Sequence, residues 1–328
     1  MTEPQISVVL PFRDVESTLG EALDSVLAER SLAIEVLAID DGSRDASRAI
    51  ASGRERVRVL DGGGRGLVAA LNLGIAEARA PLIARMDGDD ITLPGRLAAQ
   101  HARMKRGDLA ALGTRVEAFG DVGDGLARYV AWQNGLLTPE DHAREIFVEA
   151  PLCHPSTMLR SDVLRALGGY RDGPFAEDYD LWLRLAEAGH AMAKLETTGL
   201  RWRHREGRLT FTDPRYSPDA MRTLKAASLA TRLRRESRAM VVWGAGPVGR
   251  RLARAMEPHG FRATRFVDVD PLKIGRIARG VPITSYESLD PSAHFVVFAV
   301  GSLGARALVR EALVQRGFVE GRDFLCAA

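Results

Sequence analysis

Short apolar runs alternate with amphipathic segments through the first hundred residues. Four runs have strand character: Ile6–Leu10, Ile34–Ile39, Val57–Leu60 and Leu82–Met86. Short, mostly apolar runs between turn residues are typical of strands, and the β-branched run Ile6–Leu10, ended by Pro11, predicts a buried one. Three segments with apolar residues at helical spacing separate them: about 18–27, 45–52 and 67–78. This alternation predicts an α/β fold, with a mostly parallel sheet and helices on both of its faces.

The first amphipathic segment also carries a helix-start pattern. Thr18-Leu19-Gly20-Glu21 has the Thr-x-x-Glu form of a capping box. The apolar positions that follow have the spacing of one helix face. We therefore expect a helix that begins at about Thr18 and buries this face.

The remainder of the chain changes character twice. Residues 108–205 mix a strand over about 112–119 with a helix over about 177–188, and residues 206–238 are Arg-rich and helical in pattern. A second βαβ signature then begins at Met240. We predict three parts: an α/β domain over 1–205, a helical connector over 206–238 and a small Rossmann-like domain over 239–328.

Composition narrows the class of protein. The 328 residues are 46% apolar and 27% charged, with 45 basic and 43 acidic residues, typical of a soluble globular protein. A net charge of +2 gives no reason to propose a nucleic-acid or anionic-membrane partner. Cys153 and Cys326 lie far apart, which excludes a disulfide scaffold. With no signal-peptide pattern and no apolar run of about 20 residues, we expect a cytoplasmic enzyme without a transmembrane segment.

Acidic residues gather where predicted strands end. Asp87-Gly88-Asp89 follows Met86, and carboxylates two residues apart at a bend can hold Mg²⁺ or Mn²⁺. Asp40-Asp41 follows the second strand, where a carboxylate could accept a hydrogen bond from a nucleotide base. Either group could instead be an ordinary turn or helix cap. Ligands bind beyond the carboxyl ends of such strands, which favours a functional interpretation.

Further candidate groups come later in the chain. Glu177-Asp178 precedes a helix, where a carboxylate can compensate the helix dipole or act as a general base. His154 and His204 could contact a metal or a phosphate, although isolated histidines are more often structural.

In this order, six segments resemble the family 2 glycosyltransferases of the GT-A fold: ISVVLPFRD, VLAIDDGSRD, GLVAALNLGI, ARMDGDD, LCHPSTMLR and AEDYDLWLRL. The resemblance covers about residues 4–210. It implies inverting, metal-dependent transfer of a sugar from a nucleotide-diphosphate sugar to an acceptor hydroxyl, in polysaccharide or glycoconjugate synthesis. The acceptor could be a glycan, a lipid-linked glycan or a protein, and peripheral membrane association would be compatible with it.

The resemblance also implies roles for individual residues. Asp178 matches the catalytic base, and His154 and Glu177 lie on the acceptor side. Asp87 and Asp89 match the metal-binding Asp-x-Asp, with His204 as a further metal or diphosphate contact. The residues matching the nucleotide-sugar site are Pro11, Asp14, Asp40, Asp41, Arg85 and Asp87.

The C-terminal segment has its own motif. Gly244, Gly246 and Gly249 follow a predicted strand and open a helix, and Asp268 ends the next strand, as in dinucleotide-binding folds. The motif predicts a site for NAD(P) or another nucleotide. The glycines could equally serve only close packing of helix on strand.

Two other classes of function stay open at this point. The chain could be a nicotinamide-dependent oxidoreductase or a nucleotide-sugar sensor with a degenerate transferase domain, or a regulatory protein that binds without turnover. A degenerate domain should have lost at least one of Asp41, Asp87, Asp89 and Asp178. All four are present, which favours the transferase.

Overall fold

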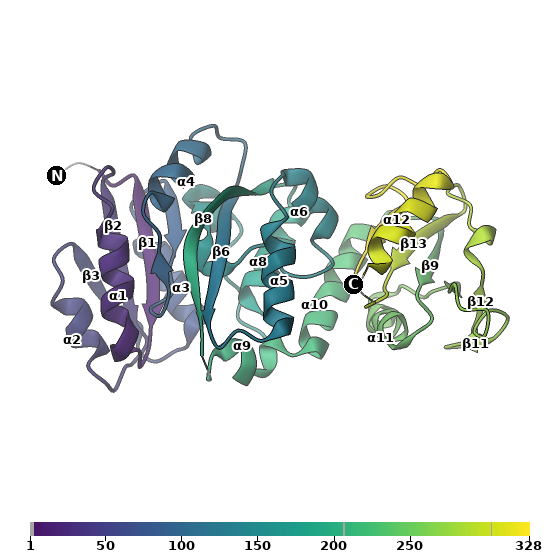
Figure 1. Cartoon of the computed structure of the whole chain (residues 1–328), viewed down its shortest axis with the longest axis horizontal. Coiled ribbons are helices and arrows are strands. Elements are labelled where there is room, and N and C mark those ends of the chain that lie inside the picture. The colour runs from purple at the N-terminus through teal and green to yellow at the C-terminus, as the bar shows by residue number, and fades with distance from the viewer. Residues whose placement is uncertain (1–2, 206, 303) are drawn as a thin grey trace. The chain divides into compact units, whose positions relative to one another are not determined.

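The computed structural model describes residues 3–205, 207–302 and 304–328 (Figure 1). The chain divides into two compact units. Unit 1 comprises residues 1–143 and 150–213, and unit 2 comprises residues 144–149 and 214–328. Each unit is built around its own sheet. Residues 144–149, from the middle of the chain, belong to unit 2.

Unit 1 contains an eight-stranded sheet of order β3-β2-β1-β4-β7-β6-β8-β5. The strands are β1 (Ile6–Phe12), β2 (Ile34–Asp40), β3 (Val57–Asp61), β4 (Leu82–Arg85), β5 (Ile91–Thr92), β6 (Ala111–Gly120), β7 (Met158–Arg160) and β8 (Met192–His204). The first four pair in parallel, as do β6 and β8. β7 is antiparallel to β4 and β6, and β5 to β8. The predicted α/β class and mostly parallel sheet are confirmed.

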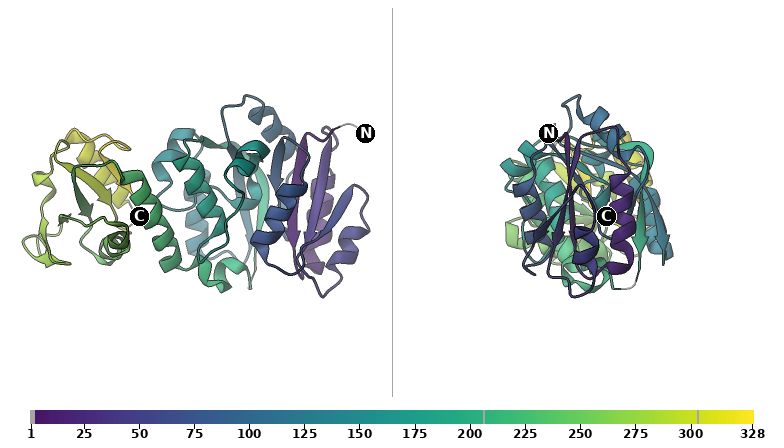
Figure 2. Two further views of the ribbon diagram at one scale, coloured as in Figure 1. Left: turned by 180° about the vertical axis from the view of Figure 1, so that it is seen from behind. Right: turned by 90° about the vertical axis from the view of Figure 1, so that its left-hand side faces the viewer.

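Helices cover both faces of this sheet (Figures 1 and 2). They are α1 (Glu16–Leu27), α2 (Ser47–Ser52), α3 (Leu67–Glu77), α4 (Arg96–Met104), α5 (Asp124–Asn134), α6 (Pro139–Glu145), η1 (His154–Ser156), α7 (Ser161–Ala166), α8 (Glu177–Glu187) and α9 (Leu209–Thr212). Alternate residues of β1 face opposite ways. Val8 and Leu10 share a core with Leu19 and Leu23 of α1. Gly74 of α3 instead lies against Val9, on the other face.

The start of α1 differs from the prediction. The helix begins at Glu16, so Thr18 lies inside it and donates to the carbonyls of Val15 and Gly88. The first backbone N–H groups are capped from another loop: Val15 N donates to Ser47 Oγ and Glu16 N to Asp45 Oδ2. The capping box was wrong because a distant loop supplies the acceptors that a local Thr-x-x-Glu would provide.

Unit 2 has a six-stranded sheet of order β11-β12-β10-β9-β13-β14. Its strands are β9 (Ala239–Trp243), β10 (Arg265–Val267), β11 (Ile277–Ala278), β12 (Val281–Thr284), β13 (His294–Phe298) and β14 (Phe324–Cys326). All neighbours pair in parallel except β11 and β12. Without β11, the strand order is that of a Rossmann fold. Its helices are η2 (Pro214–Tyr216), α10 (Pro218–Leu233), α11 (Pro247–Met256), η3 (Glu257–His259), η4 (Tyr286–Ser288) and α12 (Ala305–Gln315).

Residues 144–149 are built into unit 2. Glu145 is 3% exposed and forms ion pairs with Arg306 at 3.2 Å and Arg310 at 2.7 Å. Val148 packs on the core of this unit, and its carbonyl accepts a hydrogen bond from Lys225.

A helix that crosses a membrane must be both long and apolar. None of the helices among the described residues combines the necessary length and hydropathy.

Two helical glycines allow a test of the packing of α3. A Cβ atom on Gly74 would lie 2.5 Å from Cγ1 of Val9, whereas a Cβ on Gly125 of α5 would meet nothing within 4 Å. We expect Gly74→Ala to lower the free energy of unfolding by about 1–3 kcal/mol, because the buried contact must be relieved. Gly125→Ala should cost nothing, since alanine favours helix over glycine. Urea unfolding followed by circular dichroism checks both; equal midpoints would contradict the packing of α3 on β1.

Candidate active site

The loops that follow β1 and β2 are tied together by acidic side chains. Asp14 adopts φ 49°, and its Oδ1 accepts a hydrogen bond from Arg44 N at 2.7 Å. Asp40 accepts from Ser43 N through Oδ1 and from Arg48 through Oδ2. Pro11 lies beyond the last pair between β1 and β4, so its missing N–H interrupts no bond of that ladder. These residues shape one end of the sheet.

Asp40 and Asp41 differ in what remains free to bind. Both oxygens of Asp40 are used inside the protein, and these hydrogen bonds with the Arg48 charge lower its pKa against the effect of burial. Asp41 is 6% exposed, and Gly66 N, at 3.1 Å from both carboxylate oxygens, is the donor assigned to it among the described residues. Asp41 therefore retains acceptor capacity, and Asp40 acts as the local turn cap.

Three carboxylates meet beyond the end of β4. One oxygen from each of Asp87, Asp89 and Asp90 lies within 4.8 Å of the others. Asp90 is fully buried; its Oδ1 accepts from Arg203 N at 2.8 Å, and its Oδ2 has no partner among the described residues. Burial and the neighbouring carboxylates raise the pKa of Asp89, and raise that of Asp90 well above its ordinary value. A divalent cation is the group that such a cluster suits.

Arginines surround this carboxylate group. Arg85 is 2% exposed and donates to Asp87 Oδ1 at 2.6 Å. Arg208, from the segment after β8, lies 3.6 Å from Asp87 and 4.0 Å from Asp90. Arg205 approaches Asp89 Oδ2 at 3.3 Å. Burial opposes the charge of Asp87, but Arg85 and Arg208 more than offset it and lower the pKa of Asp87. Positive charge is therefore fixed where a diphosphate could also be held.

Asp178 stands in the first turn of α8, half-buried, and its Oδ1 accepts a hydrogen bond from Tyr179 N. Burial first, and then the charge of Glu177, raise the pKa of Asp178 to about 7. The charge of Arg85 acts on Asp178 and on Glu177 as well as on Asp87. Arg85 thus couples the carboxylate group electrostatically to the start of α8. A carboxyl group poised near neutral pH is suited to general base catalysis.

His154 and Glu177 are enclosed, with 7% and 2% exposed. The Nε2 atom of His154 is 2.6 Å from Tyr170 Oη, and its Nδ1 is 3.9 Å from Glu177 Oε1. Burial and Arg85 hold the pKa of His154 well below its usual value, so the ring is neutral at pH 7. Both side chains are therefore enclosed next to Asp178 rather than part of an open surface.

His204 ends β8 and is only 3% exposed. Its ring packs edge-on against Trp202 at 4.3 Å, and burial lowers its pKa to about 4. The metal-suited group of the described residues consists of the three aspartates without His204. The predicted third ligand therefore stands apart from that group in this conformation.

Two members of the site were missed from the sequence. Asp90 is the last letter of the DGDD segment, but the sequence could not show which of its carboxylates is enclosed. Arg208 lies about 120 residues further along and carries no local motif. Only the pairing of β8 with β5 and β6 brings this part of the chain to the end of β4.

The Gly-rich turn of unit 2 has a separate geometry. A Cβ on Gly249 would lie 1.9 Å from the Gly244 carbonyl oxygen, and one on Gly244 would lie 2.5 Å from the Ala299 oxygen. Packing therefore requires both glycines. A Cβ on Gly246 would meet nothing within 4 Å. Asp268 accepts from Ala245 N at 3.0 Å and pairs with Lys273 at 3.2 Å, so it holds the turn.

The sequence comparisons agree with one another. Residues 7–168 match the family model for Glycosyl transferase family 2. Over 197 residues the chain is 32% identical to EpsE of Bacillus subtilis (strain 168), a protein named as a glycosyltransferase, covering 57% of this chain and 68% of EpsE. It is 30% identical over 191 residues to an Escherichia coli UDP-Gal:alpha-D-GlcNAc-diphosphoundecaprenol beta-1,3-galactosyltransferase, covering 55% of this chain and 67% of that protein.

Solved structures share the fold. TarS 1-349 of S. aureus in complex with UDP-GlcNAc superposes with TM-score 0.57 and 18% identity, covering 70% of this chain and 66% of that one. The mannosyltransferase PcManGT of Pyrobaculum calidifontis, in complex with GDP-Man and Mn²⁺, gives 0.51 and 14%, covering 79% and 74%. The relatives favour the glycosyltransferase over the alternative of a nicotinamide-dependent oxidoreductase. This chain belongs to glycosyltransferase family 2 and is a glycosyltransferase.

Proposed function

We propose that this glycosyltransferase transfers a sugar with inversion from a nucleotide-diphosphate sugar to an acceptor hydroxyl, with Asp178 as the general base. The observation that carries the proposal is the half-buried Asp178 carboxyl, whose pKa is raised to about 7. It stands within the electrostatic reach of Arg85, which also binds Asp87. The arrangement links a proton acceptor to the group of residues suited to a diphosphate leaving group.

Donor recognition falls to the loops after β1 and β2. Asp41 has acceptor capacity for the N3–H of a uracil base, while Asp14 and Asp40 hold the two loops in shape. Pro11 contributes an apolar wall. Arg85 and Arg208 provide the positive charge that a nucleoside diphosphate requires.

Asp87, Asp89 and Asp90 would hold the divalent cation of the reaction. Their fit rests on the enclosed Asp90 Oδ2, a carboxylate oxygen without a partner among the described residues, within a group that is otherwise repulsive. When bound, Mg²⁺ or Mn²⁺ neutralises the negative charge that develops on the departing nucleoside diphosphate. The described ring of His204 stands outside this set, and we assign it a supporting role.

The chemical step needs one base. Asp178 accepts the proton of the acceptor hydroxyl as its oxygen attacks the anomeric carbon from the face opposite the leaving group. Neutral His154, hydrogen-bonded to Tyr170, lies beside Glu177, and the Glu177 charge keeps Asp178 basic enough to take that proton. A glycosidase would instead need two carboxyl groups flanking the scissile bond.

The substrate class follows from the relatives. One of them is named for transfer from UDP-Gal to a sugar on diphosphoundecaprenol, and another, WbnJ of Escherichia coli, for O-antigen biosynthesis. We propose a UDP-sugar as donor and, as acceptor, a glycan carried on a polyprenyl diphosphate. The chain spans about two thirds of EpsE and of the galactosyltransferase, so these substrates are our proposal for this protein.

A second binding function is proposed for unit 2. Close packing explains Gly244 and Gly249, and Asp268 has partners within the protein. The open position of Gly246, the N-cap residue of α11, is the one feature that packing does not explain. A residue without a side chain at this point lets a diphosphate approach the backbone N–H groups of the helix, as NAD(P) or another nucleotide would.

The carboxylate group generates a metal prediction. Saturating Mn²⁺ should raise the melting temperature of the wild-type protein, because the cation relieves repulsion among three close carboxylates. Asp90→Asn should lose most of that shift and weaken Mn²⁺ binding at least tenfold. Asp108→Asn, at an exposed ion pair with Arg103, serves as the matched control. An unchanged Mn²⁺ shift in Asp90→Asn would contradict the assignment.

The base generates a kinetic prediction. Asp178→Asn should reduce kcat by about 10²–10⁴, because the acceptor proton then has no base. In the wild type, kcat/KM should rise with pH through about 7, since Asp178 must lose its proton to act. Initial rates of nucleoside-diphosphate release across pH 5–9 check both. Asp172→Asn, which removes the same charge at an exposed position, is the control. If kcat/KM instead rose with pH through about 4, Asp178 would be excluded as the base.

The Gly-rich turn allows a variant that blocks a ligand without disturbing the fold. Gly246→Ala places its Cβ in open space, so its melting temperature should match the wild type. We expect at least tenfold weaker binding of whichever nucleotide the full chain binds among NAD⁺, NADP⁺, ADP and UDP-sugars, measured by calorimetry. Asp41→Ala, which removes the proposed base contact of unit 1, separates this binding from nucleotide binding at the transferase site. Equal binding by the wild type and Gly246→Ala would leave the turn a packing feature.

A further inference from the structure

The charge of the chain is divided unequally between its units. Unit 2 contains 20 Lys and Arg against 12 Asp and Glu, a net charge of +8, so the remaining residues carry −6. The near-zero net charge of the whole chain conceals this asymmetry. A strongly basic unit attached to an acidic one indicates an anionic partner for the basic unit.

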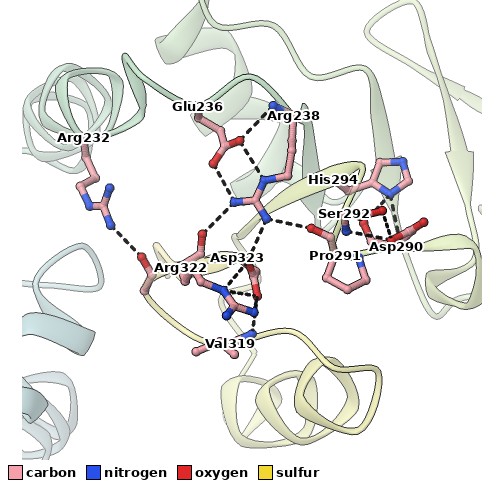
Figure 3. Close-up of polar contacts among 11 residues, drawn as sticks. Arg232, Glu236, Arg238, Asp290, Pro291, Ser292, His294, Val319, Arg322 and Asp323 are labelled. Atoms are coloured by element: carbon pink, nitrogen blue, oxygen red, sulfur yellow. Dashed lines mark hydrogen bonds and ion pairs between the residues drawn. The ribbon is translucent and has the colours of Figure 1, made fainter.

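Most acidic residues of unit 2 form ion pairs with basic residues of the same unit. Arg238 lies between Glu236 and Asp323, at 2.7 and 2.8 Å, and Arg322 also binds Asp323 (Figure 3). Glu257 pairs with Arg279 at 2.7 Å. The remaining positive charge is therefore left for the surface.

Part of that excess lies on exposed arginines that follow α10, follow η3 and precede β11. Arg234, Arg235, Arg262 and Arg276 are exposed, and no hydrogen bond or ion pair of their side chains is found among the described residues. Arg234 lines a shallow groove of about 350 Å³ together with His259 and Phe261. Arg262 directly follows Phe261. The Glu257–Arg279 pair then joins η3 to the turn between β11 and β12.

The segment from the end of β10 to β11 exposes aliphatic side chains. Val269, Leu272 and Ile277 are 65%, 73% and 73% exposed, and Ile274 is 37% exposed. They are interleaved with Lys273, Arg276 and Arg279 in one stretch of chain. β11 is the edge strand of its sheet. Figure 1 shows β11, β12 and α11 at the lower margin of unit 2. We call the four unpaired arginines, His259 and these four aliphatic residues the basic–apolar surface.

We propose that the basic–apolar surface binds an anionic phospholipid bilayer. Unpaired arginines attract anionic headgroups, and exposed aliphatic side chains gain by entering the boundary between headgroups and acyl chains. Nucleic acid fits less well, because base stacking uses aromatic side chains and residues 269–281 contain none. Membrane binding stands independently of the transferase chemistry. The purpose that we assign to membrane binding, which is to bring the enzyme to a lipid-linked acceptor, rests on the proposed function.

Vesicle co-sedimentation of the full chain tests the proposal without any substrate. We expect binding to vesicles of phosphatidylcholine with 30% phosphatidylglycerol, little binding to pure phosphatidylcholine, and weakening as NaCl rises from 0.1 to 0.5 M. The triple variant Arg234→Gln, Arg235→Gln, Arg262→Gln should bind about 100-fold more weakly, at about fivefold per arginine. Leu272→Ser with Ile277→Ser should bind about tenfold more weakly and retain the salt dependence.

Matched controls keep the loss specific to this surface. Leu308→Ser with Val314→Ser changes equally exposed aliphatic residues on α12, and Arg30→Gln, Arg106→Gln, Arg171→Gln removes the same charge from unit 1. Equal binding to neutral and anionic vesicles, no binding to either, or equal losses in the controls would overturn the proposal. So would arginine-dependent binding to single-stranded RNA while vesicle binding is unaffected. Nucleoside-diphosphate release with a soluble acceptor should be unchanged in all variants, which keeps failure of the transferase proposal distinguishable.

Discussion

Mutual repulsion among carboxylates is the constraint around which unit 1 is organised. Acidic residues follow the ends of several parallel strands, and three of them, Asp87, Asp89 and Asp90, approach within 4.8 Å in the one segment after β4. Such a group persists only if positive charge is fixed beside it. Arg85 supplies that charge from β4 itself, and Arg208 supplies it from the segment after β8. The long strand β8 therefore has an electrostatic role as well as a packing role, since it returns the chain to the acidic edge.

The elements that could be predicted are those whose own residues carry the signal, without reference to distant parts of the chain. β1, β2 and β4 are buried strands, and each leaves a short, mostly apolar run between turn residues. β8 alternates polar and apolar residues, pairs with both β5 and β6, and left no comparable signal. The start of α1 was misjudged for the same reason, because its capping acceptors come from Ser47 and Asp45. Information held in pairing between distant segments is not visible in one sequence.

The candidate site follows the same division. Asp41, Asp87 and Asp178 each stand beside a strand end or helix start, so a local motif identifies them. Their protonation is set by the folded surroundings: burial and Glu177 raise the pKa of Asp178, whereas Arg85 and the distant Arg208 offset burial and lower the pKa of Asp87. The segment 144–149 is a comparable case for unit 2, since Glu145 finds its arginine partners about 160 residues later. The sequence names candidate groups, and tertiary structure assigns their protonation and partners.

Net charge predicts a binding partner only when the charged residues lie where that partner can contact them. In unit 1 three carboxylates lie together in the segment after β4, where our proposal places a cation and a diphosphate to balance their charge. In unit 2 the acids are spent on internal pairs such as Arg238 with Asp323, so the basic excess remains outside. Two opposite excesses that cancel in the sum thus face different partners: a small charged ligand inside one unit, and an extended anionic surface outside the other.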